Sequence, residues 1–354
     1  MIDKRAAART AMLFGLAALL SIPPSTRADD APDLTVARGL EYLARQQQPD
    51  GSFDSPDGGT PKGPVTAAAL LAFLASGHTP DLGRYGLVVR GAADFLVKSS
   101  ADISTDRPDA TGGRPDGGRT IGQALVALAL AEVDGAGSDP AFHASVRPAL
   151  EKAVAALLKA RDAGRSSGGG WGADGRPADD LMATAWALLA LRSAQAAGMH
   201  VPRDVFDRAG AYVLKCYHAD PKASAERRGF SNANESPSPA ANAAGVLSLE
   251  LLGPAERAEL KDAMKLLSDA DTSRLAPAAL LMAQLAVSHP ANASPPPAWK
   301  ARSPLDDGGW PSTRSPSDPN APAAAYDPAG RVWPTAINAL ILSMPYRLLP
   351  LDAR

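Results

Sequence analysis

Two adjacent carboxylates, Asp179 and Asp180, stand directly before an apolar helical stretch at residues 183–191. Paired carboxylates can keep one acid protonated, and such an acid can deliver a proton to a substrate. The same residues suit a helix start, because an Asp side chain accepts hydrogen bonds from backbone N–H groups of the first turn and favours the positive end of the helix dipole. We expect capping, and we keep both residues as candidate catalytic acids.

The only cysteine, Cys216, needs testing as a metal ligand together with His218 and Asp220. On one helix, a spacing of two residues points His218 away from the other two side chains. The five histidines include no pair with the His-x-x-x-His spacing of many zinc sites. We therefore predict no metal site, no cofactor, no internal disulfide and a buried free thiol at Cys216.

A further set of candidates consists of polar or aromatic residues within otherwise apolar helical stretches. They are Gln123, Thr184, Trp186, Asn242, Trp333 and Asn338. Polar groups on a buried helix must form hydrogen bonds. They either bond to neighbouring helices or line a central cavity and contact a ligand, and both alternatives stay open.

Two classes of helical stretch alternate along the chain and would position these residues. The first class is amphipathic and carries a basic residue followed by a small one, at Arg38, Arg90, Lys152 and Arg208, with a looser fifth copy at Lys261, where Asp262 precedes Ala263. The second class is rich in Ala and Leu, at residues 66–74, 121–130, 183–191, 241–249, 275–285 and 335–342. A helix that is apolar on all sides must be buried. The alternation therefore predicts an all-α fold, an α/α toroid of about six helix hairpins, with an inner ring of apolar helices and an outer ring of amphipathic ones.

Four links between an amphipathic stretch and the following apolar one carry a glycine and then an aromatic residue. The aromatic residues are Phe53, Trp171, Phe230 and Trp310. Glycine allows a tight turn beside a large ring, and buried aromatic rings usually serve the core. We predict that these four residues are structural. Residues 290–331 are rich in Pro, and we expect this long loop to be a functional flap or an ordered wrap over one face.

The N-terminus has the layout of a secretory signal peptide. Lys4, Arg5 and Arg9 precede an apolar run at residues 11–22, which is shorter than the ~20 residues needed to cross a bilayer. We expect residues 1–28 to be removed on export, leaving a single domain at 29–354. This removes four basic residues and one acid, so the net charge of −2 becomes −5. An acidic chain binds nucleic acid poorly, and no later run is long enough for a membrane helix, so we expect a soluble periplasmic or extracellular protein.

The repeat can be read most fully near the N-terminus, where Arg38-Gly39 is followed by Tyr42-Leu43, Gln46 to Gln48 and Gly51-Ser52-Phe53. This order resembles the terpenoid cyclase and protein prenyltransferase toroid superfamily. It is more closely similar to exported bacterial proteins with prenyltransferase and squalene oxidase repeats, which are squalene-hopene cyclase-like; Phe53 replaces the family's Trp. The resemblance covers residues 34–350 and implies the same α/α toroid.

The resemblance also indicates which chemistry to look for. Cyclases of this superfamily protonate a polyene with an Asp-x-Asp-Asp motif, and aligning Thr184-Ala185 with the family's Thr-Ala places Met182 at the central proton donor. Neither this motif nor the zinc ligands of the prenyltransferases can be recognised, so enzymatic activity stays an open question.

We expect a non-catalytic binding or scaffold protein whose central cavity or loop face holds an apolar molecule or a peptide segment. One alternative is a divergent terpenoid cyclase-like enzyme acting on isoprenoids, with Asp179 or Asp180 as the acid. Another is a carbohydrate-cleaving toroid with paired carboxylates on different hairpins.

Overall fold

The structure is a computed structural model that describes residues 30–54, 61–100, 118–136, 139–163, 168–172, 179–218, 228–232, 235–253, 258–270, 275–287, 303–312 and 330–344. Most residues in these ranges are helical, and nearly all the others lie in the connections between helices. The exception is a short antiparallel ribbon of β1 (Tyr217–His218) and β2 (Gly229–Phe230), with Tyr217 opposite Phe230. The predicted all-α class is confirmed. Residues 1–28, Asp220 and most of the 290–331 loop lie outside the described residues.

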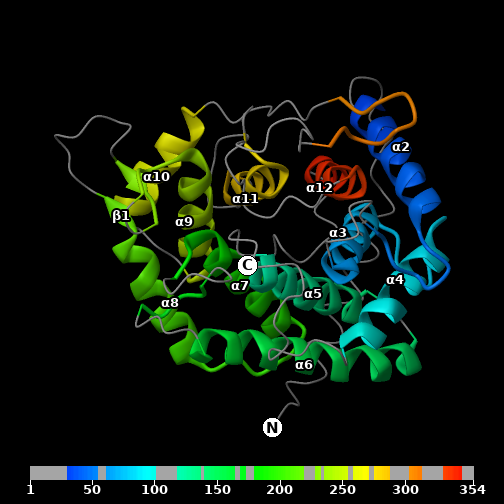
Figure 1. Cartoon of the computed structure of the whole chain (residues 1–354), viewed down its shortest axis with the longest axis horizontal. Coiled ribbons are helices and arrows are strands. Elements are labelled where there is room, and N and C mark those ends of the chain that lie inside the picture. Colours follow the sequence, from blue (N-terminus) through cyan, green and yellow to red (C-terminus); the bar gives the residue numbers. More distant parts are fainter. Residues whose placement is uncertain are drawn as a thin grey trace, which may run out of the picture.

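Six helices form a closed inner ring (Figure 1). They are α3 (Lys62–Ala75), α5 (Gly118–Asp134), α7 (Leu181–Ala196), α9 (Pro239–Leu251), α11 (Pro277–Val287) and α12 (Val332–Ser343). Each packs against the next, and α12 packs against α3. Their Ala- and Leu-rich sequences are buried nearly all round; in α7 every residue from Leu181 to Leu191 is buried. The predicted apolar stretches fall within these helices, except that α11 begins at Pro277, two residues later than expected, because proline suits a first helical turn.

The amphipathic helices lie outside this ring (Figure 1). In the described ranges they are α2 (Asp30–Gln46), α4 (Gly86–Ser99), α6 (Pro140–Ala163), α8 (Arg203–Lys215) and α10 (Ala258–Ser268). In α8 the buried residues recur every three or four positions, which turns one stripe of the helix toward the core. Helices α4, α6 and α10 pack on the inner helix that precedes each of them, whereas α2 packs mainly on α12 from the other end of the chain.

The glycine-aromatic links connect neighbouring hairpins. Gly51, Gly169 and Gly308 have φ angles of 85°, 96° and 89°. A Cβ on each would lie 2.1, 2.7 and 2.4 Å from the backbone oxygen of Gly91, Arg208 and Arg38, respectively. Only glycine fits such an approach at a positive φ. The basic-small pairs at Arg38, Arg90 and Arg208 are therefore places where a link packs on a neighbouring outer helix, and the last link packs on α2, the first outer helix.

Candidate functional site

The four aromatic residues of the links share one anchoring hydrogen bond. In each case the backbone N–H of the aromatic residue donates to a side-chain oxygen on the following inner helix. The pairs are Phe53 with Thr66 Oγ1 (2.8 Å), Trp171 with Thr184 Oγ1 (2.9 Å), Phe230 with Asn242 Oδ1 (2.7 Å) and Trp310 with Thr335 Oγ1 (2.9 Å). All four aromatic side chains are buried. Thr184 and Asn242, which are candidate ligand contacts by sequence, thus hold the links to the inner ring.

The carboxylates before α7 both bind backbone N–H groups. Asp180 is the N-cap of α7, where its Oδ1 accepts from the Ala183 N–H at 2.8 Å. Its Oδ2 accepts from Nδ2 of Asn232 at 3.1 Å. Asp179 Oδ2 accepts from the Gly170 N–H at 2.9 Å. Since both oxygens of Asp180 accept hydrogen bonds from N–H donors, protonating this carboxyl would cost one of them, which does not suit a general acid.

A buried pair, Tyr212 and Cys216, lies near these carboxylates. Burial raises the pKa of the Cys216 thiol, and burial together with the neighbouring thiol raises the pKa of the Tyr212 phenol. Both groups therefore stay protonated at neutral pH, and a protonated thiol is neither a good nucleophile nor a metal ligand. The predicted buried free thiol is confirmed.

His218 does not join Cys216, because its Nε2 pairs with Oγ of Ser231 at 2.7 Å. In the described part of the chain, no group of three or more His, Cys, Asp or Glu side chains is placed to hold a metal ion.

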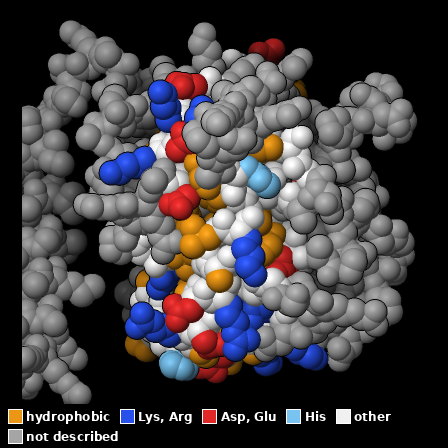
Figure 2. Space-filling view, turned by 90° about the vertical axis from the view of Figure 1, so that its left-hand side faces the viewer, with side chains coloured by type: hydrophobic (Ala, Val, Ile, Leu, Met, Phe, Trp, Pro, Cys, Tyr) orange, Lys and Arg blue, Asp and Glu red, His pale blue; other side chains and the backbone are white. Residues whose placement is uncertain are grey.

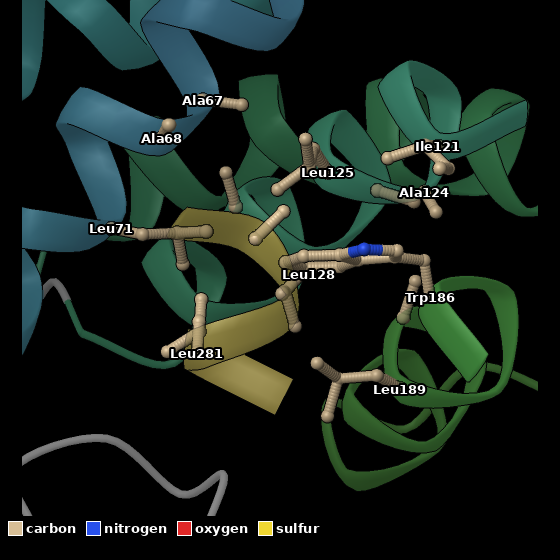
Figure 3. Packing of buried hydrophobic residues seen from close by; sticks show 14 of the residues in the cluster. Ala67, Ala68, Leu71, Ile121, Ala124, Leu125, Leu128, Trp186, Leu189 and Leu281 are labelled. Atoms are coloured by element: carbon tan, nitrogen blue, oxygen red, sulfur yellow. The ribbon is translucent and has the colours of Figure 1, made fainter. Parts of the chain in front are cut away.

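The ring centre is filled by apolar side chains from several inner helices (Figure 3). Trp186 reaches inward from α7 toward Leu125 and Leu128 of α5, Leu71 of α3 and Leu281 of α11. Each of these five side chains exposes 2% or less of its surface. The indole N–H of Trp186 is buried and has no hydrogen-bond partner among the described residues.

The remaining candidates do not complete a polar site. Asn338 donates through Nδ2 to the Pro334 carbonyl at 2.7 Å, so its amide bonds within α12. Trp333 is buried on α12, and Gln123 is half-buried on α5. Thr184 and Asn242 are engaged in links and Asn338 bonds within its own helix, so these three residues do not form one polar site.

Several polar connections that sequence reasoning missed join the helices. Asn232 caps α7 through Oδ1, which accepts from the Leu181 N–H at 2.8 Å. Glu132, a buried carboxyl on α5, accepts a short hydrogen bond from Ser193 on α7. The Arg192 Nε donates to the Leu251 carbonyl at the end of α9 at 2.6 Å. In the sequence, the last two connections could have been found from a charged or hydroxyl side chain in the last turns of a stretch rich in Ala and Leu, as at Glu132, Arg192 and Ser193.

No protein-family profile matches this chain, and no curated protein sequence does. Among solved structures, it is similar to the apo form of the type II terpene cyclase MstE from Scytonema, with a TM-score of 0.36 and 16% identity, over 91% of this chain and 100% of that one. It is also similar to a substituted form of that cyclase in complex with its product, merosterolic acid A, with a TM-score of 0.36 and 15% identity, over 90% of this chain and 98% of that one.

Proposed function

We propose that this protein is a non-catalytic scaffold of the cell envelope, a helical ring that binds a partner through its outer faces. The observation that carries this proposal is the packing of apolar side chains from α3, α5, α7 and α11 around Trp186. Trp186 and the leucines around it are buried to 2% or less, so an apolar substrate would have to displace the side chains that hold the inner helices together.

The chemistry of the described side chains also favours a scaffold over an enzyme. The two carboxylates before α7 hold backbone N–H groups, and the thiol of Cys216 is protonated. Met182, which aligns with the proton donor of the cyclases, is a buried thioether and cannot donate a proton. At the aligned position, a cyclase-like reaction would therefore lack its acid.

The outer faces suit a protein or peptide partner better than a nucleic acid. On the face that carries α8 and α10, Lys and Arg side chains are interspersed with Asp, Glu and apolar side chains (Figure 2). A nucleic-acid site would need a continuous basic surface. None of the described helices combines the length and apolar character needed to cross a bilayer.

The proposal is tested by ligand binding, with a variant that opens the centre as the positive control. Wild-type protein is mixed with squalene, with shorter isoprenoids or with xenon, and thermal unfolding and product formation are followed. We expect no stabilisation and no product. Leu71→Ala removes a fully buried side chain, and the cavity it leaves should bind xenon.

Two results would overturn the scaffold function. One is saturable stabilisation of the wild type by an isoprenoid. The other is turnover that disappears in Asp180→Asn while circular dichroism shows an unchanged fold, which would instead support the cyclase-like alternative.

Location in the cell envelope rests on the sequence of residues 1–28 and is tested separately. N-terminal sequencing of the exported protein should give a start near Asp29. A product that keeps Met1 and the apolar run would contradict export by cleavage.

A further inference from the structure

Helix α2 differs from the other outer helices in how the chain connects it to the inner helix it covers. Only 10 residues separate α3 from α4, five separate α5 from α6, and six separate α9 from α10. Helix α2 instead packs mainly on α12, which begins at Val332, and touches α3 only slightly. While α12 stays packed on α3, α2 is tethered to the ring by the 15 residues between Gln46 and Lys62, a longer connection than those of α4, α6 and α10. A longer connection returns more entropy when its contact opens.

The polar bonds that hold α2 in place converge on one short segment. Arg38 and Arg45 of α2 donate to the backbone carbonyls of Asp306 (2.5 Å) and Asp307 (2.9 Å). The Asp307 carboxylate in turn accepts two hydrogen bonds from the guanidinium of Arg331, at 2.5 and 2.8 Å. That guanidinium lies over the ring of Tyr42 of α2, 4.8 Å from its centroid.

The pair of Arg331 and Asp307, which we call the clamp, is exposed. The hydrogen bonds that join the links to the inner helices are buried. The side chains of Arg331 and Asp307 expose 30% and 48% of their surface. Exposed ion pairs contribute modestly and are screened by salt. On the other side of the same segment, the backbone of Trp310 is held to buried Thr335 of α12. The Asp307–Arg331 pair and the Trp310–Thr335 bond both hold the segment to α12. Helix α2 is held by the exposed bonds of Arg38 and Arg45, by the ring of Tyr42 under Arg331 and by its buried apolar side chains.

We propose that α2 is a detachable strap, which lifts off α12 and residues 303–312 while the inner ring stays closed. The inner ring keeps its closure because α12 packs directly on α3. Lifting the strap uncovers the outer side of α12 and the edge of Trp310 that packs against Gly39. Detachment of α2 is a conformational change of this chain alone, and it does not depend on which partner the protein binds.

Hydrogen exchange read by mass spectrometry tests the strap on the intact protein. Amides of residues 36–46 should exchange at least ~10-fold faster than those of α6 and α7. Asp307→Asn should accelerate exchange in α2 a further ~3-fold or more and leave α6 and α7 unchanged. Asp207→Asn, which removes an exposed carboxylate paired with Arg203 on α8, serves as the matched control and should leave α2 unchanged.

Wild-type protein in 1 M salt provides a second measurement that needs no substitution. Salt should accelerate exchange in α2 selectively, because it screens the exposed clamp. Exchange of α2 at the same rate as α7 in the wild type would overturn the proposal. So would an equal acceleration of all helices by Asp307→Asn, since both results mean that α2 leaves only when the whole ring unfolds.

Discussion

The contribution of one buried hydrogen bond to the free energy of unfolding can be measured by replacing each of two buried tryptophans with phenylalanine. Trp171 and Trp186 are both fully buried. The indole N–H of Trp171 donates to the Leu157 carbonyl at 2.8 Å, whereas that of Trp186 has no partner among the described residues. Replacing each by Phe removes the same N–H and a similar volume, so the difference between the variants reports the hydrogen bond.

The size of that difference follows from the two environments. Trp171→Phe loses a hydrogen bond worth about 0.5–1.5 kcal/mol, while Trp186→Phe removes an unsatisfied buried donor, whose burial costs about 1–3 kcal/mol. The free energy of unfolding should therefore fall by roughly 2–4 kcal/mol more for Trp171→Phe. With about 2.1 cal/mol/K of unfolding entropy per residue over 354 residues, this corresponds to a difference of roughly 3–5 °C in Tm.

Denaturant unfolding followed by far-UV circular dichroism, together with calorimetry, measures both variants. Circular dichroism is preferred because it does not depend on tryptophan emission. Equal losses of stability in the two variants would refute the reasoning. They would mean that the Trp186 N–H has an acceptor in solution, and a solvent or ligand molecule in the ring centre would then contradict the filled centre.

Three further outcomes are expected. Thr184→Val should lower the free energy of unfolding by about 1–3 kcal/mol, because it leaves the buried N–H of Trp171 without an acceptor; no change in denaturant unfolding would contradict the anchoring role. Asp180→Asn should keep the cap on the Ala183 N–H but lose the acceptor of the Asn232 amide, and so cost about 1–3 kcal/mol by the same measurement; an unchanged stability would contradict the contact with Asn232. The hydrogen bonds from Arg331 hold the pKa of Asp307 at about 2, below its usual 3.8, so its stabilisation is present above about pH 4 and is lost as the pH falls toward 2; the protection of α2 amides, which is the intrinsic exchange rate at the same pH divided by the observed rate, should fall over that interval and fall less in Asp307→Asn.

The inner ring could be predicted from the sequence because its signal is local. A stretch such as residues 183–191, rich in Ala and Leu on all sides, must be buried wherever it lies in the fold. Asp180 as a helix cap could be predicted for the same reason, since its main acceptor contact reaches only three residues ahead, to Ala183. Asn232, which caps the same helix, could not, because 52 residues separate it from Asp180.

The anchors of the links show where sequence reasoning stops. No feature of the sequence marks Thr66 and Thr335 as anchors, and Thr184 and Asn242 are equally compatible with ligand contacts. Their role depends on the backbone N–H of an aromatic residue 12 to 25 positions earlier in the chain. No local pattern fixes that approach, because it arises only when the link is packed between two hairpins.

The closure of the ring by its last link has a consequence for how such a chain can change over evolution. An open array of repeats can gain or lose one unit, provided that its two ends are covered by polar capping units. Here the link at Gly308 packs on the backbone of Arg38, so the first outer helix serves as the neighbour of the last hairpin and the array has no ends. Inserting or deleting one hairpin would change the angle between every pair of inner helices, which have to complete one full circle. The number of repeats is therefore fixed by geometry, and variation in length is confined to the connections between helices.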